Sequence, residues 1–86
     1  MSFITLTVVS PAGVQFKDEV TLVRVQTPIG EIEILPGHCP YIGLVLEGGM
    51  QVIQKSDGQQ RSIPVGTGSL QCDSNSVVVL SERVTA

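Results

Sequence analysis

The side chains that could act on a substrate are few, and the most conspicuous are the neighbours His38 and Cys39. His38 is the only histidine in the chain. A cysteine nucleophile needs a base within hydrogen-bond reach. Adjacent residues on a strand point to opposite sides, so these two side chains have poor geometry for a nucleophile and its base. The pattern favours a histidine in a surface loop and argues against catalysis.

Metal binding and acid–base chemistry have little more support. A structural zinc site takes four convergent ligands, whereas His38 and Cys39 offer two and Cys72 is remote in sequence. Glu31 and Glu33 share one face of a predicted strand, and paired carboxylates act at separations of about 5 to 9 Å. Residues at i and i+2 meet that spacing in any strand, so a solvated strand face is the simpler interpretation.

A phosphate-binding loop is also excluded. Residues 66–68 read Gly-Thr-Gly, but the GxGxxG pattern would need a glycine where the chain has Gln71, followed by a helix. The residues that follow have the pattern of a strand. We therefore expect no bound cofactor and no metal.

Cys39 and Cys72 are the only cysteines. Two cysteines do not make a disulfide framework, and we expect both to be free thiols in a reducing, cytoplasmic setting. Cys72 lies in an alternating pattern and is predicted to be a small core residue.

Composition bounds the remaining classes of function. The chain has 86 residues, which predicts a single domain over residues 1–86. Apolar residues make up 42 %, which indicates a folded core. Five scattered basic residues, a net charge of -3 and 3 % aromatic residues do not suit a nucleic-acid binder. No apolar run is long enough to span a bilayer, and no signal peptide is expected at the N-terminus.

Hydrophobic periodicity predicts an all-β domain. Helical spacing is absent, and short β-branched runs alternate with turn residues. A bulge near Thr21 would place Val20, Val23 and Val25 on one face, and Asp57-Gly58 predicts a hairpin. The apolar run 41–46 predicts a strand covered on both faces. The predicted strands are 4–9, 14–16, 20–25, 31–35, 41–46, 50–55, 60–65, 69–72 and 77–80.

The fold class that follows is a flattened β-sandwich or barrel of about nine to ten mainly antiparallel strands. A small sandwich without a catalytic constellation is typically an interaction module. Residues 30–40 are the best candidate for recognition, because they combine two exposed carboxylates with a loop that has a proline at each end.

The same stretch carries a family resemblance. It reads GEIEILPGHCP and resembles the segment G-E-L-G-I-L-P-G-H-A-P of the epsilon subunit of rotary F-type ATP synthases. Three further segments resemble the N-terminal domain of the same family, in the same order along the chain. The opening strands correspond to LTVVSPAGVQF at 6–16, the central hairpin to GGMQVIQKSDG at 48–58, and the end of the domain to VGTGSLQCDSNSVVVLSE at 65–82. Glu33 replaces a common glycine of the family.

The resemblance implies a non-catalytic subunit of the central stalk, peripheral to the cytoplasmic face of an energy-transducing membrane and not inserted in it. Such a subunit binds the gamma subunit and the polar loops of the membrane rotor ring (the c subunits), and so couples proton translocation to ATP synthesis. The family's two-helix C-terminal domain is expected to be absent. By resemblance, ring contacts fall on Glu31, Ile32, Glu33 and His38, and gamma contacts on Ser10, Tyr41, Ile42 and Gly43.

One alternative stays open on sequence alone. A free-standing β-sandwich module that binds a peptide or a small ligand would show the same strand pattern. The two hypotheses differ in assembly, because a stalk subunit co-purifies with a very large ATPase and a free module does not.

Overall fold

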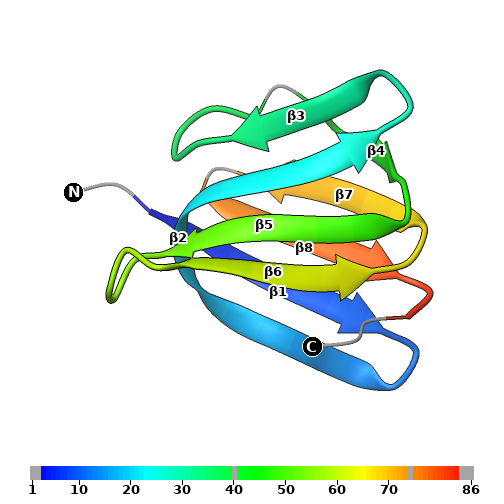
Figure 1. The fold of residues 1–86 in the computed structure, drawn as a ribbon, viewed down its shortest axis with the longest axis horizontal. Helices are drawn as coiled ribbons and strands as arrows, with labels where there is room; N and C mark the ends of the chain where they lie inside the picture. Colours follow the sequence, from blue (N-terminus) through cyan, green and yellow to red (C-terminus); the bar gives the residue numbers. More distant parts are fainter. Residues whose placement is uncertain (1–2, 40, 74, 84–86) are drawn as a thin grey trace.

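The computed structural model describes residues 3–39, 41–73 and 75–83, and these residues form eight β-strands (Figure 1). No helix occurs among them, so they contain no helical segment that could cross a membrane. The all-β prediction is confirmed. The strands are β1 (Ile4–Ser10), β2 (Gly13–Thr27), β3 (Gly30–Ile34), β4 (Gly43–Val45), β5 (Gly48–Gln54), β6 (Gln60–Val65), β7 (Gly68–Asp73) and β8 (Ser76–Ser81).

One continuous sheet folds over to make both layers of the sandwich. Its order is β4-β7-β8-β1-β2-β5-β6, and β3 pairs with β2. Figure 1 shows β3, the end of β2, β5 and β6 in the near layer, with β7, β8 and β1 behind them. All pairs are antiparallel except β1 with β8, which run parallel.

β2 belongs to both layers, and an irregularity lets it turn the corner. Its first half pairs with β1 as far as Val20, and its second half pairs with β3 and β5. The register with β5 shifts between Val20 and Leu22. A bulge bends a strand and changes which side chains face inward. Val20, Val23 and Val25 are accordingly all buried, as the sequence pattern predicts.

The core lies between the two layers and is made almost entirely of aliphatic side chains. Each strand contributes alternate residues, as expected for a sheet with one covered face. Phe16, Ile32, Cys39 and Cys72 pack against the edge of this core. The buried residues are Ile4, Leu6, Val8, Val20, Val23, Val25, Ile34, Val45, Met50, Val52, Ile63, Val65, Leu70, Val77 and Val79.

Three predicted strands differ from the structure. Residues 14–16 and 20–25 belong to the single strand β2, because Lys17 and Asp18 continue its pairing with β1 rather than ending it. The run 41–46 shortens to β4, which lies at an end of the sheet and has one face open. Ile42 and Leu44 are 65 % and 46 % exposed, so the prediction of a strand covered on both faces was wrong.

The Asp-Gly hairpin is confirmed. β5 and β6 pair out to Ile53 and Gln60 on either side of the turn. Gly58 has a φ of 69°, which a residue with a side chain rarely adopts. The Asp57 carboxylate accepts a hydrogen bond from the backbone N–H of Gln59 at 2.9 Å and closes the turn.

Candidate functional site

The two outer faces of the sandwich differ in chemistry, and the polar one lies over β3, β2, β5 and β6. The register places Glu33, Arg24, Gln51 and Ser62 side by side across these strands. Residues directly opposite one another share a face. This row therefore gives the near layer of Figure 1 a charged and amide-rich surface.

Arg24 organises the carboxylates of this face. Its Nη2 donates to the Glu33 carboxylate at 2.6 Å, and its Nη1 donates to Gln51 Oε1 at 3.3 Å. Glu31 lies 3.7 Å from the guanidinium and accepts a hydrogen bond from the Gln26 amide at 3.0 Å. Glu33 is thus committed to a partner within the chain, while Glu31 keeps more of its charge free.

The environment of Arg24 holds its charge. The hydrogen bond to Glu33 raises the pKa of Arg24 above its ordinary value; partial burial opposes this rise, and the charges of Glu33 and Glu31 add to it. The stability gained from a raised folded-state pKa is fully present below the unfolded-state pKa. It is lost only as pH rises through the folded-state pKa. Arg24 therefore adds no pH dependence to stability near neutral pH.

The predicted ring-facing residues lie on β3 and in the loop after it. Glu31 and Glu33 are exposed on the outer face of β3, and Ile32 is half-buried against the core. His38 is exposed and lies beyond the end of the strand, where its backbone N–H donates to the Leu35 carbonyl at 2.9 Å. β3 therefore carries three of the four predicted ring contacts at consecutive positions, and His38 lies in the loop that follows the strand.

The predicted gamma-facing residues come from two distant parts of the chain. Ser10 ends β1, and its hydroxyl accepts a hydrogen bond from the backbone N–H of Ala12 at 3.2 Å. The Tyr41 hydroxyl donates to the Leu44 carbonyl at 2.8 Å. A Cβ on Gly43 would lie 3.1 Å from that hydroxyl, so Gly43 makes room for the tyrosine ring. Ile42 projects from the same segment and is largely exposed.

The outer face of β4, β7, β8 and β1 joins these two parts. The register aligns Leu44, Ser69, Leu80, Val9 and Val14 in one row across the strands. Leu80 is 43 % exposed and Val14 61 %. No member of this row is charged. It forms an apolar strip that leads from β4 to the turn at Ser10.

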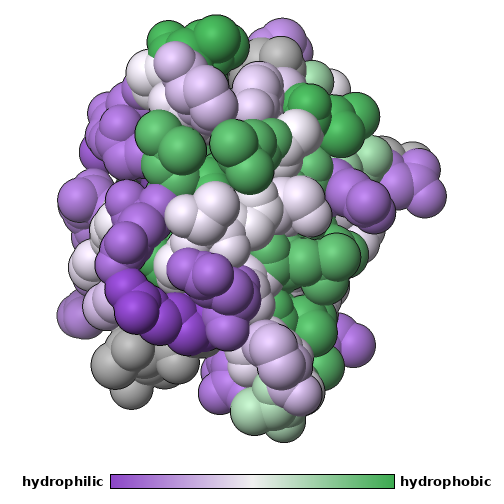
Figure 2. All heavy atoms as spheres, turned by 90° about the vertical axis from the view of Figure 1, so that its right-hand side faces the viewer, coloured by the Kyte–Doolittle hydropathy of each residue, from purple (hydrophilic) through white to green (hydrophobic). Residues whose placement is uncertain are grey.

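The apolar strip continues to the end of the sandwich that Figure 2 shows, which is the right-hand end of Figure 1. Apolar groups run from the top of that view toward its lower right, and most of the strongly hydrophilic residues lie to the left. Ile29, in the turn between β2 and β3, and Leu46, after β4, add exposed apolar side chains. Contiguous exposed apolar surface of this kind marks interaction sites.

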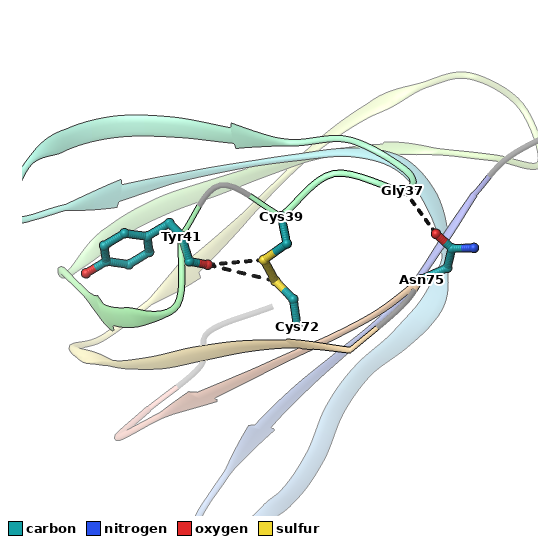
Figure 3. Close-up of a disulfide and its surroundings, with 5 residues drawn as sticks. All are labelled: Gly37, Cys39, Tyr41, Cys72 and Asn75. Atoms are coloured by element: carbon teal, nitrogen blue, oxygen red, sulfur yellow. Dashed lines mark hydrogen bonds between the residues drawn. A yellow bond between two sulfur atoms is a disulfide. The ribbon is translucent and has the colours of Figure 1, made fainter.

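The cysteines correct a prediction. Cys39 and Cys72 form a disulfide and are not free thiols (Figure 3). Their Cα atoms lie 6.3 Å apart although 33 residues separate them in sequence. Both residues are half-buried at the edge of the core. The bridge ties the loop after β3 to β7, and while it is closed Cys39 cannot act as a nucleophile.

Residues 66–68 have a structural explanation. Ser69 follows Gly68 into β7, and no helix follows the glycines. A Cβ on Gly68 would come within 1.8 Å of the Leu80 carbonyl oxygen, so this glycine permits close approach of β7 and β8. Among the described residues, no group of three or more His, Cys, Asp or Glu side chains is arranged to hold a metal ion.

Sequence reasoning missed three features of these surfaces: the disulfide, the role of Arg24 and the apolar strip. Each joins residues that are far apart in sequence. A signal existed for one of them, because Arg24 and Glu33 have opposite charges on two strands joined by a short turn.

Comparison with known proteins agrees with this geometry. Residues 3–86 match the family described as "ATP synthase, Delta/Epsilon chain, beta-sandwich domain". The chain is 33 % identical over 82 residues to the ATP synthase epsilon chain of Corynebacterium aurimucosum, covering 95 % of this chain and 67 % of that one. It is 40 % identical over 62 residues to the epsilon chain of Rhodococcus opacus, covering 72 % of this chain and 51 % of that one.

Solved structures show the same fold. A chain of the Euglena gracilis mitochondrial ATP synthase, in a structure of OSCP, F1 and the c-ring, superposes with a TM-score of 0.88 at 17 % identity and covers 99 % of this chain and 54 % of that one. A chain in the central stalk and c-ring structure from Tetrahymena thermophila gives 0.72 at 9 % identity, covering 95 % and 65 %.

The chain spans about half to two thirds of the length of the curated relatives described above. The match nevertheless runs through nearly all of this chain and includes every strand of the sandwich. The chain therefore belongs to the ATP synthase delta/epsilon family, of which it represents the β-sandwich domain.

Proposed function

We propose that this domain is a non-catalytic rotor element that binds the gamma subunit and the membrane rotor ring, and so couples proton translocation to ATP synthesis. It would act on the cytoplasmic side as a peripheral component. Family membership supports the assignment to an ATP synthase. The contrast between its two outer faces supports the division of the surface between two partners.

The apolar strip is the observation that carries the gamma contact. Ser10 lies at one end of it, and Ile42 and Gly43 lie at the other. Burial of exposed apolar surface is the main favourable term in association, at roughly 25 cal/mol per Å². The charged face over β3 and β5 offers a partner much less of this energy, because its polar groups would lose water.

The β3 edge suits a polar partner. Glu31, Glu33 and His38 are exposed there, and Arg24 already neutralises part of the acidic charge. We assign this edge to the polar loops of the ring. Exposed charge pairs contribute about 0 to 1 kcal/mol each, so this contact depends on several weak interactions and on salt.

The gamma assignment is tested by placing a charge in the apolar strip. Leu80→Glu is compared with Ser62→Glu, since both residues are exposed on outer faces but in opposite layers. Each variant is mixed with gamma subunit and with epsilon-depleted ATP synthase, and binding and ATP-driven proton pumping are measured.

We expect Leu80→Glu to weaken gamma binding and pumping while its melting temperature stays close to that of the parent. Ser62→Glu should bind as the parent does. Gamma binding that survives Leu80→Glu and is lost in Ser62→Glu would place the contact on the other face. A parent chain that binds neither gamma nor the depleted enzyme would favour a free-standing binding module.

A further inference from the structure

The loop that carries His38 is fastened to the hairpin of β7 and β8 at two points, and His38 lies between them. On one side, the backbone N–H of Gly37 donates to the Asn75 side-chain oxygen at 3.0 Å. On the other, Cys39 is bonded to Cys72 of β7. Figure 3 shows both fastenings beside one another. The position of His38 relative to β7 and β8 is therefore set by one hydrogen bond and one covalent bond, in addition to its own hydrogen bond to Leu35 after β3.

The sheet itself does not depend on the covalent fastening. β7 is held by backbone pairing to β8 along its whole length and to β4 at its start. Both cysteines contact only the edge of the core, and both are half-buried rather than enclosed. Opening the bridge therefore frees the loop without removing a strand from the fold.

The structure also accommodates the opened form. The Tyr41 carbonyl oxygen lies 3.2 Å from Cys39 Sγ and 3.9 Å from Cys72 Sγ, as the dashed lines of Figure 3 indicate. A disulfide sulfur carries no hydrogen, so these are simple contacts while the bridge is closed. After reduction, a thiol S–H can donate to that carbonyl. The reduced thiols then have an acceptor beside them before any rearrangement.

We propose that the Cys39–Cys72 bridge is a redox-sensitive latch on the His38 loop, opened by a dithiol reductant and closed by a disulfide oxidant. Disulfides in compartments kept reducing are usually transient or redox-sensing. Its consequence for the rotor rests on the proposed function, because His38 belongs to the surface assigned to the ring. With the latch closed the loop presents His38 in one position, and with the latch open ring binding weakens.

The exchange is balanced without a further reactant. A thiolate of the reductant attacks one sulfur of the bridge and forms a mixed disulfide, and the other cysteine leaves as a thiolate that takes up a proton. The second thiol of the reductant then displaces the remaining cysteine. Two electrons and two protons pass to Cys39 and Cys72, and the reductant becomes an internal disulfide. A low-molecular-weight disulfide reverses the reaction.

The latch is tested by hydrogen exchange on the whole chain, with and without dithiothreitol, beside the double variant Cys39→Ser/Cys72→Ser. We expect the amides of 37–39, 41 and 42 to exchange about tenfold faster or more after reduction, as local opening allows, while amides of β1 and β5, which exchange only through global unfolding, remain slower than those of the loop. The double variant should show the fast exchange without reductant and no response to it. Restoring oxidant should return the parent chain to slow exchange.

The same samples are then bound to a rotor ring from epsilon-depleted enzyme. We expect weaker binding by the reduced parent and by the double variant. Unchanged exchange at 37–39, 41 and 42, exchange of β1 and β5 as fast as that of the loop, or a response to reductant in the double variant would each overturn the latch. Faster loop exchange with undiminished ring binding would support the latch and refute the assignment of His38 to the ring.

Discussion

The close approach of β7 and β8 at Gly68 predicts a sharp difference between the effects of substituting Gly66 and Gly68. Gly68 begins β7 and pairs with Ser81 of β8. In Gly68→Ala, the new Cβ would lie 1.8 Å from the Leu80 carbonyl oxygen and 2.8 Å from Ser81 Cα, which are backbone atoms. Gly66→Ala is the matched control, because the three atoms nearest its Cβ would belong to the exposed side chains of Glu82 and Arg83, whose Cγ atoms can move by rotation about χ1, and not to backbone.

The loss of stability in Gly68→Ala follows from the distance by which β7 and β8 must separate. Real Cβ contacts almost never fall below 3.0 Å, so β7 and β8 must part by more than 1 Å at Gly68. Two backbone hydrogen bonds, worth about 1 kcal/mol each, are weakened. The hydrogen bonds of the buried Ser81 hydroxyl are distorted as well, which costs about 1 kcal/mol or more. The total is about 3 kcal/mol. For a domain of this size that corresponds to a fall in Tm of about 12 to 24 °C.

The assay is thermal and urea unfolding followed by circular dichroism on the parent and both variants. We expect a loss of about 3 kcal/mol or no folded protein for Gly68→Ala, and a change below about 1 kcal/mol for Gly66→Ala. Equal changes in the two variants would refute the reasoning. They would mean either that β7 can shift to relieve the contact at residue 68, or that the side chains of Glu82 and Arg83 cannot move away from residue 66.

Three further predictions concern the bridge, the acidic edge and the fold. Breaking the 33-residue loop closed by the disulfide with Cys39→Ser/Cys72→Ser should cost about 3.7 kcal/mol in urea unfolding, and the loss should match that of the reduced parent; an oxidised parent no more stable than the variant would contradict it. Glu31→Gln should reduce the salt dependence of ring binding more than Glu33→Gln, because Arg24 already holds Glu33; the reverse order, measured at two salt concentrations, would count against this. The far-ultraviolet circular dichroism spectrum of the chain should be that of a β protein, and a substantial helical signal would be inconsistent with the eight-stranded fold.

The local patterns along the chain predict the strands well, because they depend on near neighbours. In the predicted strand 31–35, Ile32 and Ile34 alternate with Glu31 and Glu33, and Ile34 is fully buried. The bulge at Val20–Leu22 followed from a break in the same alternation. A one-residue irregularity moves a whole set of side chains to the other face, so it leaves a clear trace in sequence.

Features that depend on which strands are neighbours could not be read in the same way. The apolar run 41–46 indicated burial on both faces, but β4 lies at an end of the sheet and leaves Leu44 open. Leu80 joins Leu44 in the apolar strip only because β7 lies between β4 and β8. Order within a sheet is a property of the whole chain, and the sequence pattern of a single strand does not contain it.

The disulfide is a second feature that depends on which elements are neighbours in the fold. Counting two cysteines favours free thiols, because so few cannot form a framework. Pairing of Cys39 with Cys72 requires the loop after β3 to cross over β7, and that crossing follows from the fold. The candidate contact residues on β3 could be proposed from sequence, whereas the latch beside them needed the structure.

The central claim is that the apolar strip faces the gamma subunit, and cross-linking in the assembled enzyme tests it most directly. A photoreactive residue is placed at Ile42, beside the strip, and in a second variant at Ser62, in the opposite layer. After illumination of the purified ATP synthase, the cross-linked partners are identified by mass spectrometry. We predict a product with gamma from position 42 and none from position 62; a gamma product from position 62 alone would contradict the account.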